Sequence, residues 1–241
     1  MTPKNTLLII TDLNPSHKTG LGLDIRITTQ QGCKSVSVLT GIYADRPSLH
    51  YCLDTYQVLQ QLESLKDCGI NAIRLGLLNS HEIGLLIGQK LQKMFYDVPI
   101  VIDGRALIPN GKKFLDSQKV RKFCQFILKT VQLLVIDEKN LPRLCAHLCP
   151  NIIGTNNQLE SLINYGCETV MLVECHENKA SYVLSDKRNI IHMTSDNQLT
   201  IPEQETATTI ACHIANGLDV MQALRSMSIY TTQKLAKESL T

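Results

Sequence analysis

The feature that most constrains the fold is a repeated alternation of short apolar runs with amphipathic helical patterns. The apolar runs are rich in Val, Ile and Leu and predict buried strands, while the segments between them place apolar residues three or four positions apart. The predicted strands span residues 6–11, 34–43, 71–78, 98–103, 131–137, 167–174, 180–186 and 188–193. The predicted helices span residues 21–31, 53–69, 80–95, 116–129, 157–166, 205–216 and 219–237, and Ser80 is a candidate N-cap. The predicted strands 180–186 and 188–193 are expected to pair as an antiparallel hairpin. This alternation predicts an α/β fold in which a mostly parallel central sheet lies between layers of helices.

The chain has 241 residues and is predicted to form a single domain, 1–241, because no repeat and no low-complexity linker divides it. Its formal net charge is +2 and its basic residues are dispersed, which is not the electrostatic footprint of a nucleic-acid-binding protein. No apolar run is long enough for a signal peptide or a membrane span. We therefore expect a cytoplasmic protein with no nucleic-acid or membrane partner.

The chain contains nine cysteines and no export signal, which indicates free thiols rather than disulfides. Cys145, His147 and Cys149 have a spacing that resembles a metal-ligand pattern, but no second ligand pair follows them. Small buried thiols are the favoured interpretation of this run and also of Cys175 beside His176.

Polar residues follow most of the predicted strands. Parallel α/β sheets bind ligands at the carboxyl ends of their strands, so these residues are expected to share one edge. They are residues 12–16, 40–45, 76–79, 103–105, 137–140 and 174–176. The segment IPEQETATT, at 201–209, is expected at the same edge as a loop that leads into a helix. Such a helix start can hold an anion, because its first N–H groups lack partners.

The opening stretch LLIITDLNPSHKTGLGLDIRITTQQGCKSVSVLTGI resembles the start of the hydroxymethylpyrimidine/phosphomethylpyrimidine kinases of thiamine biosynthesis, which belong to the ribokinase-like superfamily. The positions that match the family pattern are Pro15, Ser16, Gly20, Asp24, Gly32, Ser37, Val38 and Thr40. The later segments RLGLLNS, IVIDGRALIPNGK and LVIDEKN stand where the family has further motifs. The resemblance implies a ribokinase-like three-layer α/β/α sandwich and ATP-dependent phosphorylation of a pyrimidine. It also implies ATP and magnesium as cofactors and a homodimer.

Asp24 takes the place of a family residue that hydrogen-bonds the pyrimidine. The resemblance puts Gly20, Asp45 and Leu77 on the substrate side with it. A carboxylate suits an aminopyrimidine, which offers N–H donors. The alternative interpretation of Asp24 is a surface aspartate in the first turn of a helix, where the helix dipole favours it.

Asp103 takes the place of the family aspartate that lies near the metal. With Asp137 it forms a candidate magnesium site, since hard cations prefer carboxylate oxygens. The alternative interpretation of Asp103 is a turn residue at the end of a strand.

The family's phosphate loop reads GTGC or GTGD, and here Glu205, Thr206, Ala207 and Thr208 take its place. Both glycines are replaced, and Thr208 stands where the family has the Cys or Asp that faces the acceptor hydroxyl. Glu205 adds a negative charge that repels a triphosphate at short range. The segment is therefore predicted to serve mainly as a helix entry, with Thr206 or Thr208 as the capping side chain.

Further changes fall on the same machinery. Val173 replaces a phosphate-side lysine, and either alignment of residues 137–140 loses the glutamate that orients magnesium. His17 and Lys18 replace a glycine pair, and Asp45 replaces a substrate-side glutamine. Together these changes indicate a kinase site whose phosphoryl-transfer parts are weakened.

Three hypotheses follow from these residues. The chain is a pyrimidine kinase in which Asp45 or His17 serves as the base and Asp103, Asp137 or Glu138 holds magnesium, although an exposed loop histidine is the simpler interpretation of His17. Alternatively, it is a non-catalytic pyrimidine-binding or regulatory pseudokinase that keeps Asp24. The third hypothesis is a structural or interaction role that keeps only the fold.

Overall fold

The computed structural model describes residues 5–16, 18–44, 49–78, 80–108, 117–176, 179–187, 189–194 and 201–227. The strands are β1 (Thr6–Leu13), β2 (Lys34–Ala44), β3 (Leu49–Cys52), β4 (Ile70–Leu75), β5 (Ile100–Asp103), β6 (Leu133–Asp137), β7 (Thr169–His176), β8 (Lys179–Asp186) and β9 (Ile190–Thr194). The helices are α1 (Gly20–Gln30), α2 (Thr55–Glu63), α3 (His81–Met94), α4 (Ser117–Ile127), α5 (Asn140–Leu148), α6 (Thr155–Asn164) and α7 (Glu203–Ala215). Short 3-10 helices span Gly104–Ala106 and Leu128–Thr130, and residues 220–227 are also helical.

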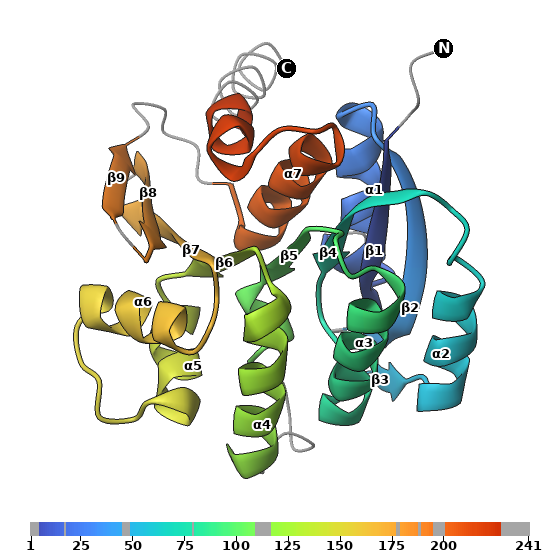
Figure 1. The fold of residues 1–241 in the computed structure, drawn as a ribbon, viewed down its shortest axis with the longest axis horizontal. Helices are drawn as coiled ribbons and strands as arrows, with labels where there is room; N and C mark the ends of the chain where they lie inside the picture. Colours follow the sequence, from blue (N-terminus) through green and yellow to red (C-terminus); the bar gives the residue numbers. More distant parts are fainter. Residues whose placement is uncertain are drawn as a thin grey trace.

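Within these residues the strands form one nine-stranded sheet in the order β3-β2-β1-β4-β5-β6-β7-β8-β9. The six strands from β2 to β7 in this order are parallel to one another, and β3, β8 and β9 pair antiparallel at the two edges. Helices α1 and α7 lie over one face, and α2 to α6 lie over the other (Figure 1). This three-layer arrangement confirms the predicted fold class.

Alternate residues of β1 explain how a continuous apolar run serves both layers. Leu8 and Ile10 pack with the helices α2 to α6, whereas Leu7 and Ile9 pack with α7. All four side chains are fully buried. Successive side chains of a strand point to opposite faces, so a strand covered on both sides must be apolar throughout.

The predicted elements agree with the structure in type and differ mainly at their ends. The antiparallel pairing of β8 with β9 is confirmed. The predicted cap Ser80 is also confirmed, because its side chain accepts a hydrogen bond from the N–H of Ile83 at 3.1 Å. The short edge strand β3 was not predicted. Of the predicted helix at 219–237, residues 228–237 lie outside the described part of the chain.

Among the described residues, no helix combines the length and the apolar composition that crossing a membrane requires. The same residues contain no group of three or more His, Cys, Asp or Glu side chains that could hold a metal ion. Cys145 is buried and Cys149 is half-buried, as expected for thiols near the end of α5.

Candidate functional site

The candidate site lies where the carboxyl ends of β1, β4, β5 and β6 meet the first turns of α7. The structure brings Asp24, Asp103, Asp137 and Thr208 into this region. Leu77 is half-buried beside it, and its carbonyl accepts the hydroxyl of Thr40 at 2.8 Å. Two further predicted site residues, His17 and Asp45, lie outside the described residues.

Arg74 is the centre of the site. It lies in β4 and its side chain is fully buried between two carboxylates. Its Nη2 donates to Oδ2 of Asp103, and its Nε lies 3.5 Å from Oδ2 of Asp24. Nε also donates to the hydroxyl of Thr208 at 3.2 Å. A buried guanidinium requires such partners, because an unpaired charge in the interior is very costly.

The side chain of Gln204 contacts the carboxylate of Asp24 directly. Its side-chain Nε2 donates to Oδ1 of Asp24 at 2.8 Å and to the carbonyl of Gly20 at 2.9 Å. Its Oε1 accepts from the N–H of Gly20 at 3.1 Å and from Nη2 of Arg105 at 2.6 Å. The amide therefore binds both backbone groups of Gly20 and a carboxylate, which are the kinds of groups that a bound aminopyrimidine would need.

Gly20 lets the start of α1 lie close to the end of β1. Its φ is +67°, and an added Cβ would lie 2.7 Å from the carbonyl oxygen of Asp12. Asp12 itself lies at a register shift in the pairing of β1 with β2. The irregularity turns the end of β1 toward the start of α1.

The carboxyl group of Glu203 is held by three N–H donors. Its Oε1 accepts from the backbone N–H of Arg105 at 3.1 Å. Its Oε2 accepts from the backbone N–H of Asp137 at 2.9 Å and from Nδ2 of Asn140 at 3.2 Å. These contacts tie the first residue of α7 to the ends of β5 and β6.

The segment 201–209, expected as a loop that leads into a helix, is helical from Glu203 onward, two residues before the predicted helix start at 205. Helix α7 begins at Glu203, so Glu205 to Thr208 lie in its first turns, and all four side chains are buried. The prediction of a Thr206 or Thr208 cap is wrong. Thr206 donates its hydroxyl to the carbonyl of Ile201 at 3.3 Å, and the hydroxyl of Thr208 lies 2.7 Å from Oδ1 of Asp24 and 2.9 Å from the carbonyl of Gln204.

The two carboxylates of the predicted magnesium site are engaged by the protein. Oδ2 of Asp103 contacts both Arg74 and Nη2 of Arg105, the latter at 3.2 Å. Oδ1 of Asp137 accepts the backbone N–H groups of Lys139 at 3.0 Å and Asn140 at 2.7 Å. Magnesium needs near-octahedral oxygen ligands, and two arginines beside one carboxylate repel a divalent cation. The contacts of this conformation do not fit the ion.

Burial and neighbouring charges shift the pKa values of these groups in different directions. Burial raises the pKa of Asp24, although Arg74 opposes it. Burial also raises the pKa of Asp12. Asp103 is equally buried, but Arg105 and Arg74 outweigh that effect and lower its pKa. Burial, together with the nearby charge of Asp103, raises the pKa of Glu203 to about 8.

This raised pKa leads to a pH prediction. We expect the free energy of unfolding to decrease as the pH rises from 4.5 to about 8, by up to about 1.4 kcal/mol per pH unit. The folded state holds the proton of Glu203 more tightly than the unfolded chain does, whose ordinary pKa is 4.5. The contribution is therefore full below the ordinary pKa and lost above the folded one. Urea unfolding of the protein and of Glu203→Gln across this range measures the slope, which the variant should lack. Equal slopes would contradict the assignment.

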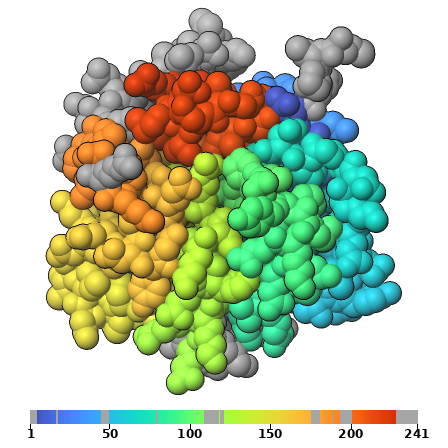
Figure 2. Space-filling view, in the orientation of Figure 1, coloured from blue at the N-terminus to red at the C-terminus, as the bar shows by residue number. Residues whose placement is uncertain are grey.

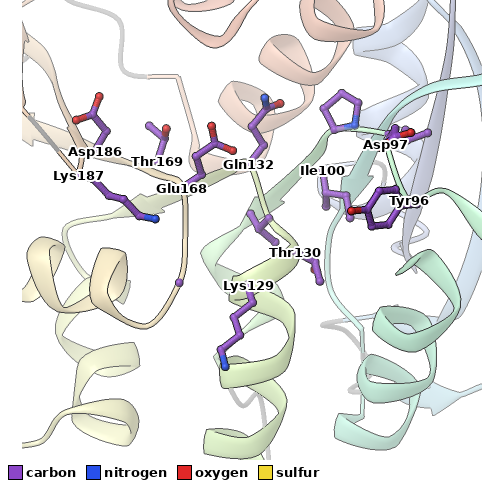
Figure 3. A pocket seen from close by; sticks show the side chains of 14 residues that line it. Tyr96, Asp97, Ile100, Lys129, Thr130, Gln132, Glu168, Thr169, Asp186 and Lys187 are labelled. Atoms are coloured by element: carbon purple, nitrogen blue, oxygen red, sulfur yellow. The ribbon is translucent and has the colours of Figure 1, made fainter. Parts of the chain in front are cut away.

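A separate hollow of about 800 Å³ lies at the opposite edge of the sheet, at the amino ends of β5, β6 and β7 (Figure 3). It is lined by charged, neutral polar and apolar side chains, including Gln132, Glu168, Lys187 and Tyr96. None of the predicted site residues lines it. Ligands of parallel sheets bind at the carboxyl ends instead, where the cluster of Arg74 lies.

Sequence reasoning missed Arg74, and it placed Arg105, Glu203 and Gln204 at the ligand edge only as members of longer segments, without a role for any of them. Arg74 was detectable as a lone charge inside an apolar strand, which requires a buried partner. Glu203 and Gln204 directly follow Pro202, a residue that often marks a helix start. Their partners lie far away in the sequence, and no local pattern identifies them.

Nearly the whole chain, including the residues around Arg74, matches one known protein family. Residues 15–241 match the family model described as phosphomethylpyrimidine kinase. The chain belongs to the phosphomethylpyrimidine kinase family. The match covers nearly the whole chain and thereby includes every residue of the cluster.

Individual relatives agree with this family assignment. The chain is 28% identical over 137 residues to the hydroxymethylpyrimidine/phosphomethylpyrimidine kinase THI20 of Saccharomyces cerevisiae, a match that covers 52% of this chain and 25% of that protein. The chain thus aligns with about a quarter of the length of that curated relative.

Solved structures confirm the ribokinase-like fold. The phosphomethylpyrimidine kinase of Clostridium difficile superposes with a TM-score of 0.78 at 18% identity, covering 96% of this chain and 100% of that one. Pyridoxal kinase of Bacillus subtilis, solved as an ADP complex, gives 0.78 at 17% identity, with coverage of 96% and 90%. Pyridoxal kinase of Staphylococcus aureus in complex with pyridoxal gives 0.79 at 16% identity, with coverage of 95% and 86%. The homodimer expected from the family stays a prediction.

Proposed function

We propose that this chain is a phosphomethylpyrimidine kinase-type protein that no longer transfers phosphoryl groups, and that its former transfer site now serves to hold α7 against the sheet. The observation that carries the proposal is the position of Glu203 and Gln204. Their side chains occupy the N–H donors and the Asp24 carboxylate that a phosphate or a pyrimidine would otherwise contact.

The proposal is supported by what phosphoryl transfer requires. Backbone N–H groups must converge on the transferred group, and a base must face the acceptor hydroxyl. Here the backbone of residues 205–208 is helical, and the hydroxyl of Thr208 is engaged by Asp24 and Arg74. A threonine hydroxyl is also no base near neutral pH. In the space-filling view, the red atoms of the α7 region lie directly against the green and yellow-green parts of the chain (Figure 2).

Of the ligand-binding alternatives, the pyrimidine-binding pseudokinase depends on access to Asp24. That carboxylate is fully buried and already accepts two side-chain hydrogen bonds. Binding of a pyrimidine would therefore require Gln204 to move away. The closed arrangement favours the structural role over pyrimidine binding.

The test combines a thermal-shift measurement with an ADP-release assay on the same sample. We expect neither ATP with magnesium nor hydroxymethylpyrimidine to raise the melting temperature, because a ligand stabilises only a protein that binds it. ADP release should equal the protein-free blank, while a catalytically active relative run in parallel should turn over. A shift with ATP and measurable turnover would overturn the proposal. A shift with the pyrimidine alone would support the binding protein instead.

A further inference from the structure

The Glu203 cradle is the set of three donors formed by the backbone N–H of Arg105, the backbone N–H of Asp137 and the side-chain amide of Asn140. The donors come from three elements: the turn after β5, the end of β6 and the first residue of α5. Their distances to the two carboxyl oxygens are 3.1, 2.9 and 3.2 Å. The relative exposure of Glu203 is 5%, so these bonds are formed inside the protein.

The chemistry of the cradle selects a group with two oxygens on one centre. A water molecule has two lone pairs and cannot accept from three donors at once. A carboxylate offers about four acceptor positions, and a phosphate offers more. Two of the donors are backbone groups fixed by strand ends, so the cradle keeps its shape when its occupant changes. Buried donors left without an acceptor are costly, which gives an incoming oxyanion a driving force.

The charges around the cradle set how strongly it holds an anion. Arg105 attracts the carboxyl group of Glu203, whereas Asp103 and Asp137 repel it. Near neutral pH the raised pKa of Glu203 keeps its carboxyl group protonated, so these charges favour a small occupant that can carry a proton over a triphosphate.

We infer that the Glu203 cradle is a binding site for a small oxyacid group, a carboxyl or a phosphate that can bind with a proton, and that the chain fills this site with its own Glu203. The tethered carboxyl group acts at a high effective concentration, so free anions do not displace it in the unaltered protein. Removing the side chain opens the site. This inference deepens the proposed function and rests on it, because both require the first turn of α7 to stay over the strand ends.

The test is chemical rescue of Glu203→Ala by formate. We expect the variant to melt several degrees below the unaltered protein, and formate to raise its melting temperature in a saturable way at millimolar concentrations. Phosphate is the second probe. The unaltered protein should show no such rise. Rescue should weaken as the pH rises, because the bound acid keeps a proton, and sodium chloride at equal ionic strength should not rescue the variant.

Two further variants test whether the cradle is the binding site. Glu205→Ala removes another buried carboxyl group from the same turn, and formate should not rescue it beyond the chloride control. Adding Asn140→Ala to Glu203→Ala removes one donor and should weaken the apparent formate affinity about tenfold. Absence of rescue by both formate and phosphate in a folded Glu203→Ala variant would overturn the inference.

A variant that does not fold leaves a second measurement. If Glu203→Ala is unfolded, recovery of the folded state in formate supports the inference. If neither formate nor phosphate restores the folded state of Glu203→Ala, the single variant Asn140→Ala is the deciding test. Loss of one donor must raise the pKa of Glu203 and move the alkaline midpoint of stability to higher pH. An unchanged midpoint overturns the inference. Kinase turnover in the unaltered protein would contradict the proposed function but would leave these rescue results to be judged separately.

Discussion

Replacing Arg74 with methionine is expected to lower the free energy of unfolding by about 3–5 kcal/mol, the cost of breaking a buried ion pair from one side. The variant leaves Asp24 and Asp103 buried without their shared cation. It also removes the donor to the hydroxyl of Thr208. Urea unfolding followed by circular dichroism measures the change, with the slope of the transition checked for constancy.

Lys90→Met provides the matched control for Arg74→Met. Lys90 forms an ion pair with Glu63 at 3.0 Å, but both side chains are partly exposed. Exposed ion pairs contribute from about 0 to 1 kcal/mol. The free energy of unfolding of Lys90→Met should therefore fall by less than about 1 kcal/mol. If the two variants lost similar free energy, the cluster around Arg74 would not be the stabilising element described above.

Replacing Gly76 with alanine is expected to destabilise the protein by about 2–4 kcal/mol, because overpacking a close-packed interior forces neighbouring groups to move. An added Cβ at this position would lie 1.8 Å from Nη1 of Arg74 and 2.3 Å from the hydroxyl oxygen of Thr11. The guanidinium cannot move aside easily, since both its acidic partners are buried and fixed by other bonds.

A double-mutant cycle separates this clash from other effects of the substitution. If the Cβ collides chiefly with the arginine, Gly76→Ala should cost at least about 1 kcal/mol less in the Arg74→Met background. The hydroxyl of Thr11 remains in the way, so part of the cost should persist. Strict additivity of the two changes would mean that the glycine is required for a reason other than the arginine.

Much of the fold could be predicted because its signals are local. The buried strand β1 is an apolar run, Ser80 caps a helix three residues before its partner, and the hairpin of β8 with β9 has an alternating pattern. Strand ends then predicted the edge at which Asp103 and Asp137 lie, and the family resemblance brought Asp24 to the same site. The positions of the two strand-end residues follow from topology alone.

The details of the site could not be predicted because they depend on distant partners. Arg74 contacts Thr208 across 134 positions, and Gln204 contacts Asp24 across 180. The residue at which α7 starts also depends on distant partners. Local preference for the helix is modest around a run of threonines, but Glu203 finds three donors on the sheet and moves the start two residues before the predicted one.

These distant contacts also determine when the sheet can finish folding while the chain is being synthesised. The face of the sheet that α7 covers includes Leu7, Ile9 and Ala72, all made long before the helix that buries them. Until Thr208 has been added, the same nascent chain also lacks the groups that enclose Asp24. At about 5–20 residues per second, the ribosome leaves this apolar face and its charges exposed for many seconds. Final folding of the sheet is therefore a late event in the synthesis of the chain.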